Sequence, residues 1–167
     1  VRVEHWQYDF GEQLDAWHLS EDTSLRLTGE TLYVTDPRGG RVFAFPHGGA
    51  VKPTATYTAG SGAFRAGPHL GLLFFEGEDH NLLAAALDGG RLIEYLFPGT
   101  RIARLDLVGA RAYVGRTDGT HVAVDLTNAR IRYLLPTGGA GFGPTLTAGA
   151  YVVVQSTAEV LVLEAVE

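Results

Sequence analysis

The chain has 167 residues, enough for one domain with a buried core, and its 46% hydrophobic and 19% charged residues exclude a disordered segment. The formal net charge of −6, with scattered arginines and a single lysine at Lys52, argues against nucleic acid or an anionic membrane as the partner. The absence of cysteine excludes disulfides, cysteine-ligated zinc and a cysteine nucleophile. Methionine is also absent, even at position 1, which indicates a processed or excised segment.

The first 23 residues differ from the rest of the chain. Val1–Phe10 places Trp6, Tyr8 and Phe10 on one face at period two, which predicts a β-strand. Gly11–Thr23 follows as the longest irregular stretch and holds Trp17 and His18. Two interpretations of Trp17 stay open: it covers one end of the fold as part of the core, or it stacks on a ligand as in aromatic-lined pockets.

From Ser24 onward one plan recurs four times, with short β-rich runs separated by Gly, Asn and Asp turns. Aligning the second run of each unit makes Val34, Phe74, Val114 and Val153 equivalent, at spacings of 40, 40 and 39 residues. The closing aromatics Tyr57, Tyr95 and Tyr133 recur every 38 residues, and we expect them to pack between neighbouring units.

Roughly 40–50 residues with four strands is the size of one β-propeller blade. No stretch has sustained helical periodicity. The sequence therefore predicts an all-β fold, a β-propeller of four four-stranded blades in a single domain, 1–167. The blades are expected at 24–58, 61–97, 102–135 and 143–164.

The two ends of the chain predict how the ring closes. The fourth unit reaches Glu164 without room for an outer strand, and Val1–Phe10 has the pattern of the missing piece. We expect this N-terminal strand to complete the last blade, an arrangement that leaves only short, protected sheet edges. In the alternative, it completes the fourth blade of a second copy and forms an eight-bladed dimer. The sequence thus predicts a monomer or a homodimer.

Two polar or flexible segments are candidate ligand sites. The turn Glu76–His80 has three carboxylates and an imidazole, which could bind a hard cation, but it lacks the spacing of a known calcium loop, and a solvated turn is the favoured interpretation. The Gly-rich run Thr137–Pro144 lacks the ending of a phosphate loop and precedes a strand, so it predicts a close approach of backbones between blades. The longer stretch Tyr133–Ala158 carries no charge, but its Gly, Pro and Thr content argues against a membrane helix, and no membrane insertion is expected.

The segment Ala123–Tyr133, AVDLTNARIRY, resembles the repeat of pyrroloquinoline-quinone-type propellers, which typically reads A-x-D-x-x-T-G-x-x-x-W after a G-x-x-Y-V strand. Gly109–Val114 and Gly149–Val152 are similar to that strand. The resemblance implies a fold rather than a cofactor, because the vicinal cysteines of the quinone enzymes are missing. It points to members without cofactor, such as outer-membrane assembly scaffolds, and favours an extracytoplasmic location.

Any binding site is expected on one rim of the ring. The turns between second and third strands should lie there together with the connections between blades. The candidate ligand-binding residues of this rim are Trp17, His18, Asp36, Arg38, Glu78, Asp79, His80, Arg116 and Asp118. The six histidines are scattered and no Ser-His-Asp grouping can be justified, so no catalytic residue, metal ligand or cofactor is predicted.

These observations favour a non-enzymatic binding or scaffolding propeller that holds a protein or peptide on the rim. Two alternatives stay open. One is a metal-dependent hydrolase with an ion at the channel mouth, held by Glu78, Asp79 or His80. The other is an architectural module whose role is assembly, including the eight-bladed dimer.

Overall fold

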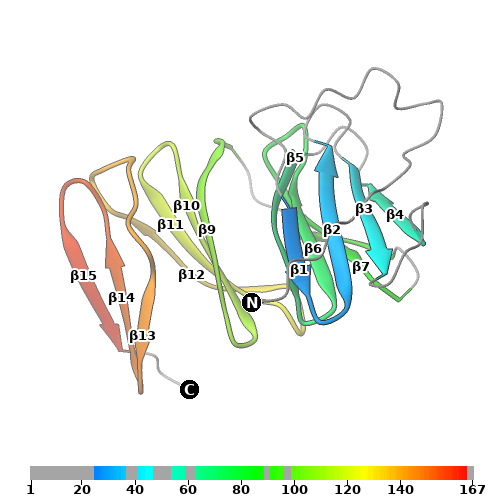
Figure 1. Ribbon diagram of the computed structural model, residues 1–167. Helices are drawn as coiled ribbons and strands as arrows, with labels where there is room; N and C mark the ends of the chain where they lie inside the picture. Colours follow the sequence, from blue (N-terminus) through cyan, green and yellow to red (C-terminus); the bar gives the residue numbers. More distant parts are fainter. Residues whose placement is uncertain are drawn as a thin grey trace. The chain divides into compact units, whose positions relative to one another are not determined.

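The computed structural model describes residues 25–36, 41–46, 54–58, 63–88, 91–95 and 99–164. Within these ranges the regular secondary structure is entirely β (Figure 1). The strands form four sheets in which every neighbour follows its predecessor in the chain. The chain divides into two compact units, Val1–Gly77 with Leu83–Ile93 and Glu78–Leu82 with Glu94–Glu167. Each unit is described by itself.

The first unit contains two sheets. One has the order β1-β2-β3-β4 and the other the order β5-β6-β7-β8. Their strands are β1 Leu25–Thr28, β2 Thr31–Asp36, β3 Arg41–Pro46, β4 Ala55–Thr58, β5 Ala63–His69, β6 Leu72–Glu76, β7 Leu82–Ala86 and β8 Leu92–Tyr95. The residues of the second sheet at Glu78–Leu82 and beyond Ile93 group with the second unit.

The second unit contains a four-stranded sheet of β9 to β12 and a three-stranded sheet of β13 to β15. The strands are β9 Ile102–Val108, β10 Arg111–Arg116, β11 Thr120–Asp125, β12 Arg130–Pro136, β13 Leu146–Ala148, β14 Tyr151–Gln155 and β15 Val160–Glu164. The described part of the fourth sheet therefore lacks an outer strand, as the sequence predicts.

The first hairpin of each sheet turns at a residue with positive φ. Gly29, Gly109 and Gly149 have φ between 55° and 58°, a region that glycine enters without a steric cost. In the second sheet the same place is taken by Leu70, with φ 50°, followed by Gly71 at φ 72°. Positive φ is the requirement of tight hairpin turns, so these positions define how the four repeats align.

Alignment on these turns corrects the predicted equivalence of the second strands. Counting from the turns, Val34 corresponds to Phe75, Val114 and Val154, so Phe74 and Val153 are each one residue out. Successive strand residues point to opposite faces, and a slip of one residue assigns the side chain to the wrong face. The spacing of about 40 residues concealed this error. In the second repeat, the pairing of the inner strand β5 with β6 has two register shifts, and these displace the residues that follow β5.

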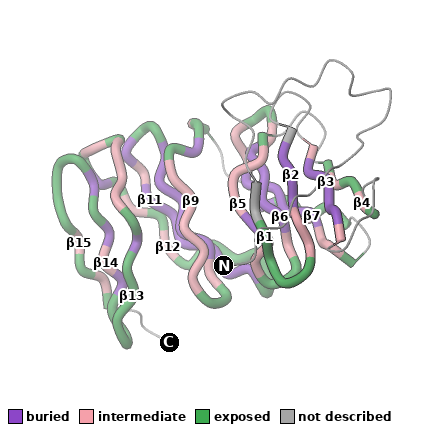
Figure 2. Tube along the Cα trace, viewed as in Figure 1, coloured by how far each residue is buried: buried purple, intermediate pink, exposed green. Residues whose placement is uncertain are grey.

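Neighbouring sheets pack face to face through the central strands. In the first unit, Tyr33, Val42 and Ala44 of one sheet share a buried cluster with Leu73 and Phe75 of the other. The buried residues lie mainly on the middle strands of each sheet (Figure 2). Fully burying a side chain of this size stabilises the fold by roughly 1.5–3 kcal/mol, so these interfaces are the main source of stability.

The second unit repeats this arrangement. Tyr113 and Ala123, on β10 and β11, form a buried cluster with Val152 and Val154 of β14. Phe142, which precedes β13, packs against the same cluster. In both units the sheet face that contains a tyrosine of the second strand, Tyr33 or Tyr113, packs on the following sheet.

The predicted packing of tyrosines between neighbouring repeats is confirmed for two of them. The Tyr57 hydroxyl of β4 donates a hydrogen bond of 3.1 Å to the carbonyl oxygen of Leu87, in the turn after β7. The Tyr95 hydroxyl of β8 donates equivalently to Leu126, in the turn after β11, at 3.2 Å. Tyr133 differs, because its hydroxyl lies 3.2 Å from the Nδ1 atom of His121.

The predicted closing strand Val1–Phe10 lies outside the described residues, so closure of the ring stays a prediction. The single-domain assignment is likewise untested.

Candidate functional site

Backbone hydrogen bonds join the turns and connections of the second unit into one surface. Thr117 N donates to Arg101 O at 3.0 Å, and Thr137 N donates to Gly119 O at 2.8 Å. Thr157 N donates to the Gly141 carbonyl oxygen at 2.8 Å. The turns between second and third strands therefore lie beside the connections that precede and follow them, as predicted. We call residues 99–101, 116–119, 137–143 and 156–159 the loop rim.

Glycines make these contacts possible. A Cβ atom on Gly139 would lie 2.9 Å from the backbone nitrogen of Ala158, and one on Gly141 would lie 2.6 Å from Cγ2 of Thr157. Both distances are too short for a side chain to fit without movement. The prediction that the Gly-rich run serves a close approach of backbones is therefore confirmed at Gly139, whereas a Cβ atom on Gly141 would meet a side chain.

Two buried hydroxyls form hydrogen bonds with the backbone of the loop rim. The Thr137 hydroxyl donates to Gly119 O at 2.7 Å. The Ser156 hydroxyl donates to Thr137 O at 3.2 Å and accepts from the backbone nitrogens of Ala158 and Glu159 at 3.2 and 3.1 Å. Because hydrogen bonds leave these loops few alternative conformations, the rim is preformed.

Asp118, in the turn between β10 and β11, has an environment that favours its charged form. Asp118 is exposed, and its Oδ1 atom accepts from Thr120 N at 2.9 Å, which closes an Asx turn. Partial burial raises the pKa of Asp118, but hydrogen bonding from Thr120 is among the contributions that outweigh it. The charge of Arg116 adds to them, and the pKa lies below its ordinary value.

The nine predicted site residues have different positions. Arg116 is buried at the end of β10. Its guanidinium lies beside Gly99: a Cβ atom added to Gly99 would be 3.6 Å from Nη1 of Arg116. Trp17, His18 and Arg38 lie outside the described residues, as does the side chain of Asp36. Of the exposed charged residues on the loop rim, Arg101 and Glu159 were not predicted.

The residues of the acidic turn Glu76–His80 differ in burial. Glu76 is buried at the end of β6 and forms an ion pair with Arg65. Glu78 and Asp79 are exposed, and His80 is half-buried with φ 60°. Nowhere in the described ranges do three or more His, Cys, Asp or Glu residues group so that they could hold a metal ion.

Sequence reasoning missed a buried histidine. The His121 ring stacks on Tyr113 and Tyr133, with centroid distances of 6.2 and 5.9 Å, and lies 5.6 Å from Phe142. Its Nε2 atom lies 3.3 Å from the Thr145 hydroxyl. Both ring nitrogens thus face hydroxyls, since Nδ1 faces Tyr133. The detectable signal was a polar residue inside the apolar run of β11.

The chemistry of this cluster favours a neutral imidazole. Burial lowers the pKa of His121 to about 4, and Asp106 opposes this shift only in part. Asp106 itself accepts from Thr145 N at 2.7 Å and from Arg104 Nε at 2.9 Å. The network links the inner strand β9 to the segment that enters β13, so its role is to join two sheets.

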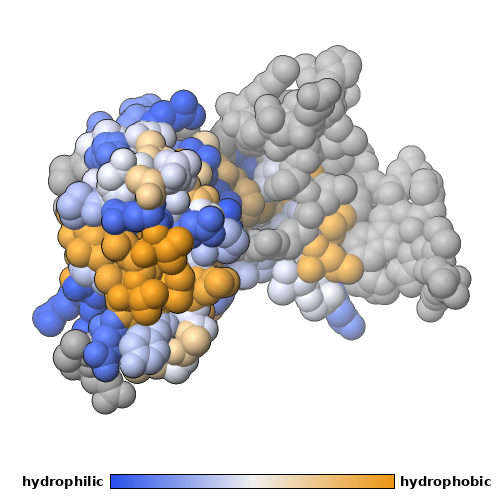
Figure 3. Space-filling view, turned by 90° about the vertical axis from the view of Figure 1, so that its left-hand side faces the viewer, coloured by the Kyte–Doolittle hydropathy of each residue, from blue (hydrophilic) through white to orange (hydrophobic). Residues whose placement is uncertain are grey.

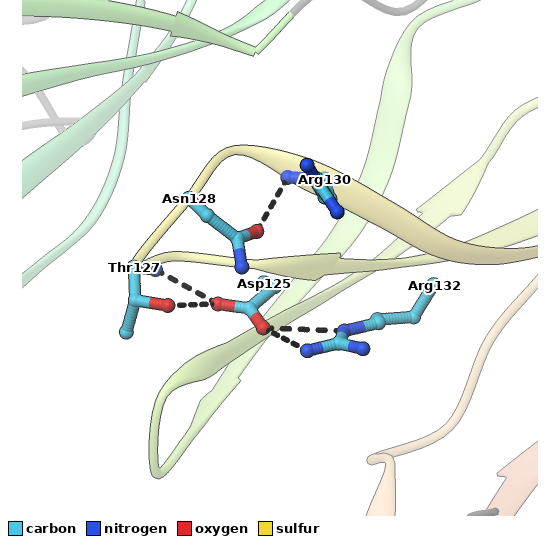
Figure 4. A network of polar contacts seen from close by, with 5 residues as sticks. All are labelled: Asp125, Thr127, Asn128, Arg130 and Arg132. Atoms are coloured by element: carbon cyan, nitrogen blue, oxygen red, sulfur yellow. Dashed lines mark hydrogen bonds and ion pairs between the residues drawn. The ribbon is translucent and has the colours of Figure 1, made fainter. Parts of the chain in front are cut away.

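The turn that carries the sequence resemblance has its own polar network (Figure 4). Asp125 Oδ1 accepts from the backbone nitrogen and hydroxyl of Thr127 at 2.9 and 2.5 Å. Its Oδ2 atom accepts from Nε of Arg132 at 3.1 Å, and Asn128 Oδ1 accepts from Arg130 N at 3.1 Å. Hydrogen bonds from Thr127 are the main cause of a strongly lowered pKa of Asp125. The acid therefore stabilises the hairpin between β11 and β12.

Within the described ranges, no helix is long and apolar enough to span a membrane.

Comparisons with known proteins identify the fold. No family model and no curated protein matches the sequence. Among solved structures, the chain is similar to the computationally designed Ika4 protein, with 12% identity, a TM-score of 0.67, and 97% of this chain and 99% of that chain covered. It is also similar to Hsv2p from Kluyveromyces lactis, with 16% identity, a TM-score of 0.67 and coverage of 89% and 51%.

BamB from Moraxella catarrhalis gives a third match, with 14% identity, a TM-score of 0.59 and coverage of 84% and 42%. The chain thus spans about half the length of Hsv2p and BamB. Together with the four sheets, these similarities show a β-propeller fold, as the sequence predicts.

Proposed function

We propose that this propeller is a non-enzymatic scaffold that binds a protein or peptide through the loop rim. One observation carries the proposal: backbone hydrogen bonds hold the rim in one conformation while Arg101, Asp118 and Glu159 stay exposed on it. A preformed surface loses little conformational entropy on binding, so it can give affinity through a few polar contacts. The exposed charges have both signs, which suits a partner with complementary charges on an extended segment.

The repeat style supports the same function. We infer that the repeats are of the pyrroloquinoline-quinone type, because Asp125 holds the Asp position of the A-x-D-x-x-T pattern and accepts two hydrogen bonds from Thr127 in the turn, where Asn128 replaces the Thr of the pattern. A propeller fold alone carries many unrelated functions, so the inference to binding depends on the rim residues and not on the fold.

A peptide-library selection tests the proposal. The intact chain is immobilised and enriched peptides are measured by calorimetry against the wild type and a charge-reversed rim variant, Arg101→Glu with Asp118→Lys and Glu159→Lys. We expect the rim variant to weaken binding at least tenfold, because it reverses the exposed charges of the rim.

The control changes the charge of two residues at the opposite ends of the strands. Arg130→Glu with Ala150→Lys changes two exposed residues in hairpin turns away from the rim. It should leave the affinity unchanged. Equal loss in both variants, or no enriched peptide at all, would contradict binding through the rim.

A further inference from the structure

A titratable side chain lies directly beneath the loop rim. His121 is buried and pairs across the strands with Gly115. Phe142, which belongs to the rim connection 137–143, covers both residues. Its ring centroid lies 5.6 Å from that of His121, and a Cβ atom on Gly115 would lie 2.5 Å from Cδ2 of Phe142. The connection therefore packs on a surface that includes an imidazole ring.

Hydrogen bonds join the residues on either side of Phe142 to the turn between β14 and β15. Gly143 N donates to the carbonyl oxygen of Gln155 at 3.0 Å. On the other side, Thr157 N donates to the carbonyl oxygen of Gly141 at 2.8 Å. If Phe142 leaves its place, the connection and this turn lose the contact that holds them together.

That turn carries part of the proposed binding surface. Glu159 is exposed in it, and Asp118 is exposed in the turn between β10 and β11. Both turns lie at the upper end of the second unit in Figure 1, and Figure 3 shows that this end is mainly hydrophilic, with apolar surface below it. Phe142 is thus an apolar residue that packs inward from a polar loop. Its position on His121 determines how the two exposed acids are spaced.

The aromatic neighbours of His121 do not compensate a positive charge. Tyr113 of β10 and Tyr133 of β12 stack on the ring. Burial raises the pKa of Tyr133 well above its ordinary value, so its hydroxyl stays neutral at acidic pH. The charge that acts on this tyrosine from β10 is that of Arg111, which is itself a cation.

The acid on the other side already has a partner. Asp106 of β9 is the group whose negative charge acts on His121. Its carboxylate accepts from Thr145 N at 2.7 Å and from Arg104 Nε at 2.9 Å, so Arg104 balances its charge. From β14 the cluster receives two buried valines. A protonated His121 would therefore be a cation in a mostly apolar site, which is costly.

Protonation would also change the hydrogen bonds of the ring. Nδ1 of His121 faces the Tyr133 hydroxyl at 3.2 Å, and Nε2 faces the Thr145 hydroxyl at 3.3 Å. A neutral imidazole has one donor and one acceptor nitrogen, whereas an imidazolium has two donors. The hydroxyl that donates to the neutral ring must then turn its hydrogen away. Both charge and hydrogen bonding thus favour the closed connection only while His121 is neutral.

We propose that His121 is a pH-sensitive latch for the loop rim: the neutral ring holds Phe142 and the connection 137–143 in place, and protonation of the ring releases them. The consequence, release of a bound protein or peptide in acid, rests on the proposed function. The latch itself is a property of the free chain.

The direction of the pH effect follows from the two forms of the rim. With the connection closed, burial lowers the pKa of His121 to about 4, whereas a solvated ring in the open form has its ordinary value of 6.5. The open form therefore binds the proton more strongly, and it gains population as the pH falls from 6.5 toward 4.

Amide hydrogen exchange in the free chain, followed by nuclear magnetic resonance, tests the latch. Thr157 N, which donates to Gly141 O, reports on the connection. Thr117 N donates to Arg101 O at the equivalent place of the preceding repeat and is the internal control. After correction for the intrinsic exchange rate, the protection of Thr157 should fall about 60-fold between pH 7 and 4.5, the factor given by the two pKa values. The protection of Thr117 should fall much less.

Two matched variants assign the effect to one ring. His121→Gln should make the protection of Thr157 independent of pH over this range. His69→Gln changes a half-buried histidine of β5 in the first unit and should keep the wild-type fall. The wild-type imidazole resonances supply a measurement that needs no variant, since the His121 ring should titrate well below pH 6.5. An equal fall at Thr157 and Thr117, a fall that persists in His121→Gln, or a His121 ring that titrates near pH 6.5 overturns the latch.

Calorimetry with a peptide selected on the rim then tests the consequence. Its affinity should be lower at pH 4.5 than at pH 7, and the loss should be smaller in His121→Gln. An equal loss in wild type and variant overturns the regulation of binding by His121. Failure to select any rim peptide contradicts the proposed function alone, because the exchange experiment uses the chain without a partner.

Discussion

The two sheet-to-sheet interfaces have the same register but different chemistry. In the first unit the interface is apolar, with Phe64 and Phe75 in an edge-to-face arrangement at 5.7 Å. In the second unit, His121 takes the place that Val42 has in the first. The comparison teaches that blade packing requires complementary shape and satisfied polar atoms, and that an apolar residue is only one way to meet both conditions.

The largest expected effect comes from truncating equivalent residues in the two interfaces. Phe75 and Val154 occupy the same register position, and both are buried. Phe75→Ala should reduce the free energy of unfolding by about 3–5 kcal/mol, since it leaves a large cavity. Val154→Ala should cost about 2 kcal/mol, because it removes less apolar surface. Urea denaturation followed by circular dichroism measures both. Equal costs would show that the first interface does not depend on its aromatic residues.

The second prediction uses pH to separate the interfaces. The pKa of His121 is about 4 in the folded protein, against 6.5 ordinarily. As pH falls below 6.5, the unfolded chain binds this proton while the folded chain does not, so stability is present above pH 6.5 and is lost toward pH 4. The loss from His121 should reach about 3 kcal/mol.

His121→Gln provides the reference for this measurement, because glutamine does not titrate. The difference in unfolding free energy between wild type and variant should shrink as the pH falls from 7 to 4.5. A difference that is independent of pH would contradict a neutral, buried imidazole in the second interface.

The third prediction compares the two docking tyrosines. Tyr95→Phe and Tyr57→Phe each remove one hydrogen bond to a backbone carbonyl of the next sheet. Each should cost about 0.5–1.5 kcal/mol. We expect the larger loss for Tyr95, which is more deeply buried and leaves its acceptor further from water. Thermal unfolding of both variants measures this difference, and a larger loss for Tyr57 would reverse the order.

The smallest effect should be stabilising. Leu70 and Ala129 have φ of 50° and 57° in exposed hairpin turns, where a Cβ atom is strained. Replacing either with glycine relieves about 1–2 kcal/mol of strain and costs about 0.5–1 kcal/mol of backbone entropy. Leu70→Gly and Ala129→Gly should therefore each raise the stability by up to about 1 kcal/mol in calorimetry. A lower melting temperature for either would show that its side chain has a compensating contact.

Much of the loop rim could be predicted, because strand order alone decides which turns share an end of a sheet. Asp118 is an example, since its turn lies beside Arg101 as expected. Arg101 and Glu159 were missed because exposure is not visible in spacing. Arg116 was predicted as a binding residue on the same rim, yet it is buried. Whether the end of a strand is covered depends on the neighbouring loop, which local pattern does not describe.

The sequence by itself determined the β-strands, their grouping into four repeats and the tight turns, because these depend on alternation and on turn residues within a few positions of each other. Only the tertiary structure decided which face each residue occupies. The corrected alignment, in which Val34 of the first repeat is equivalent to Phe75 of the second, is an example. It also decided that His121 is buried, with a lowered pKa, while Val160 and Val162 of β15 are exposed. These outcomes depend on which sheet packs against which face, and contacts between residues far apart in the chain leave no trace in the spacing of either one.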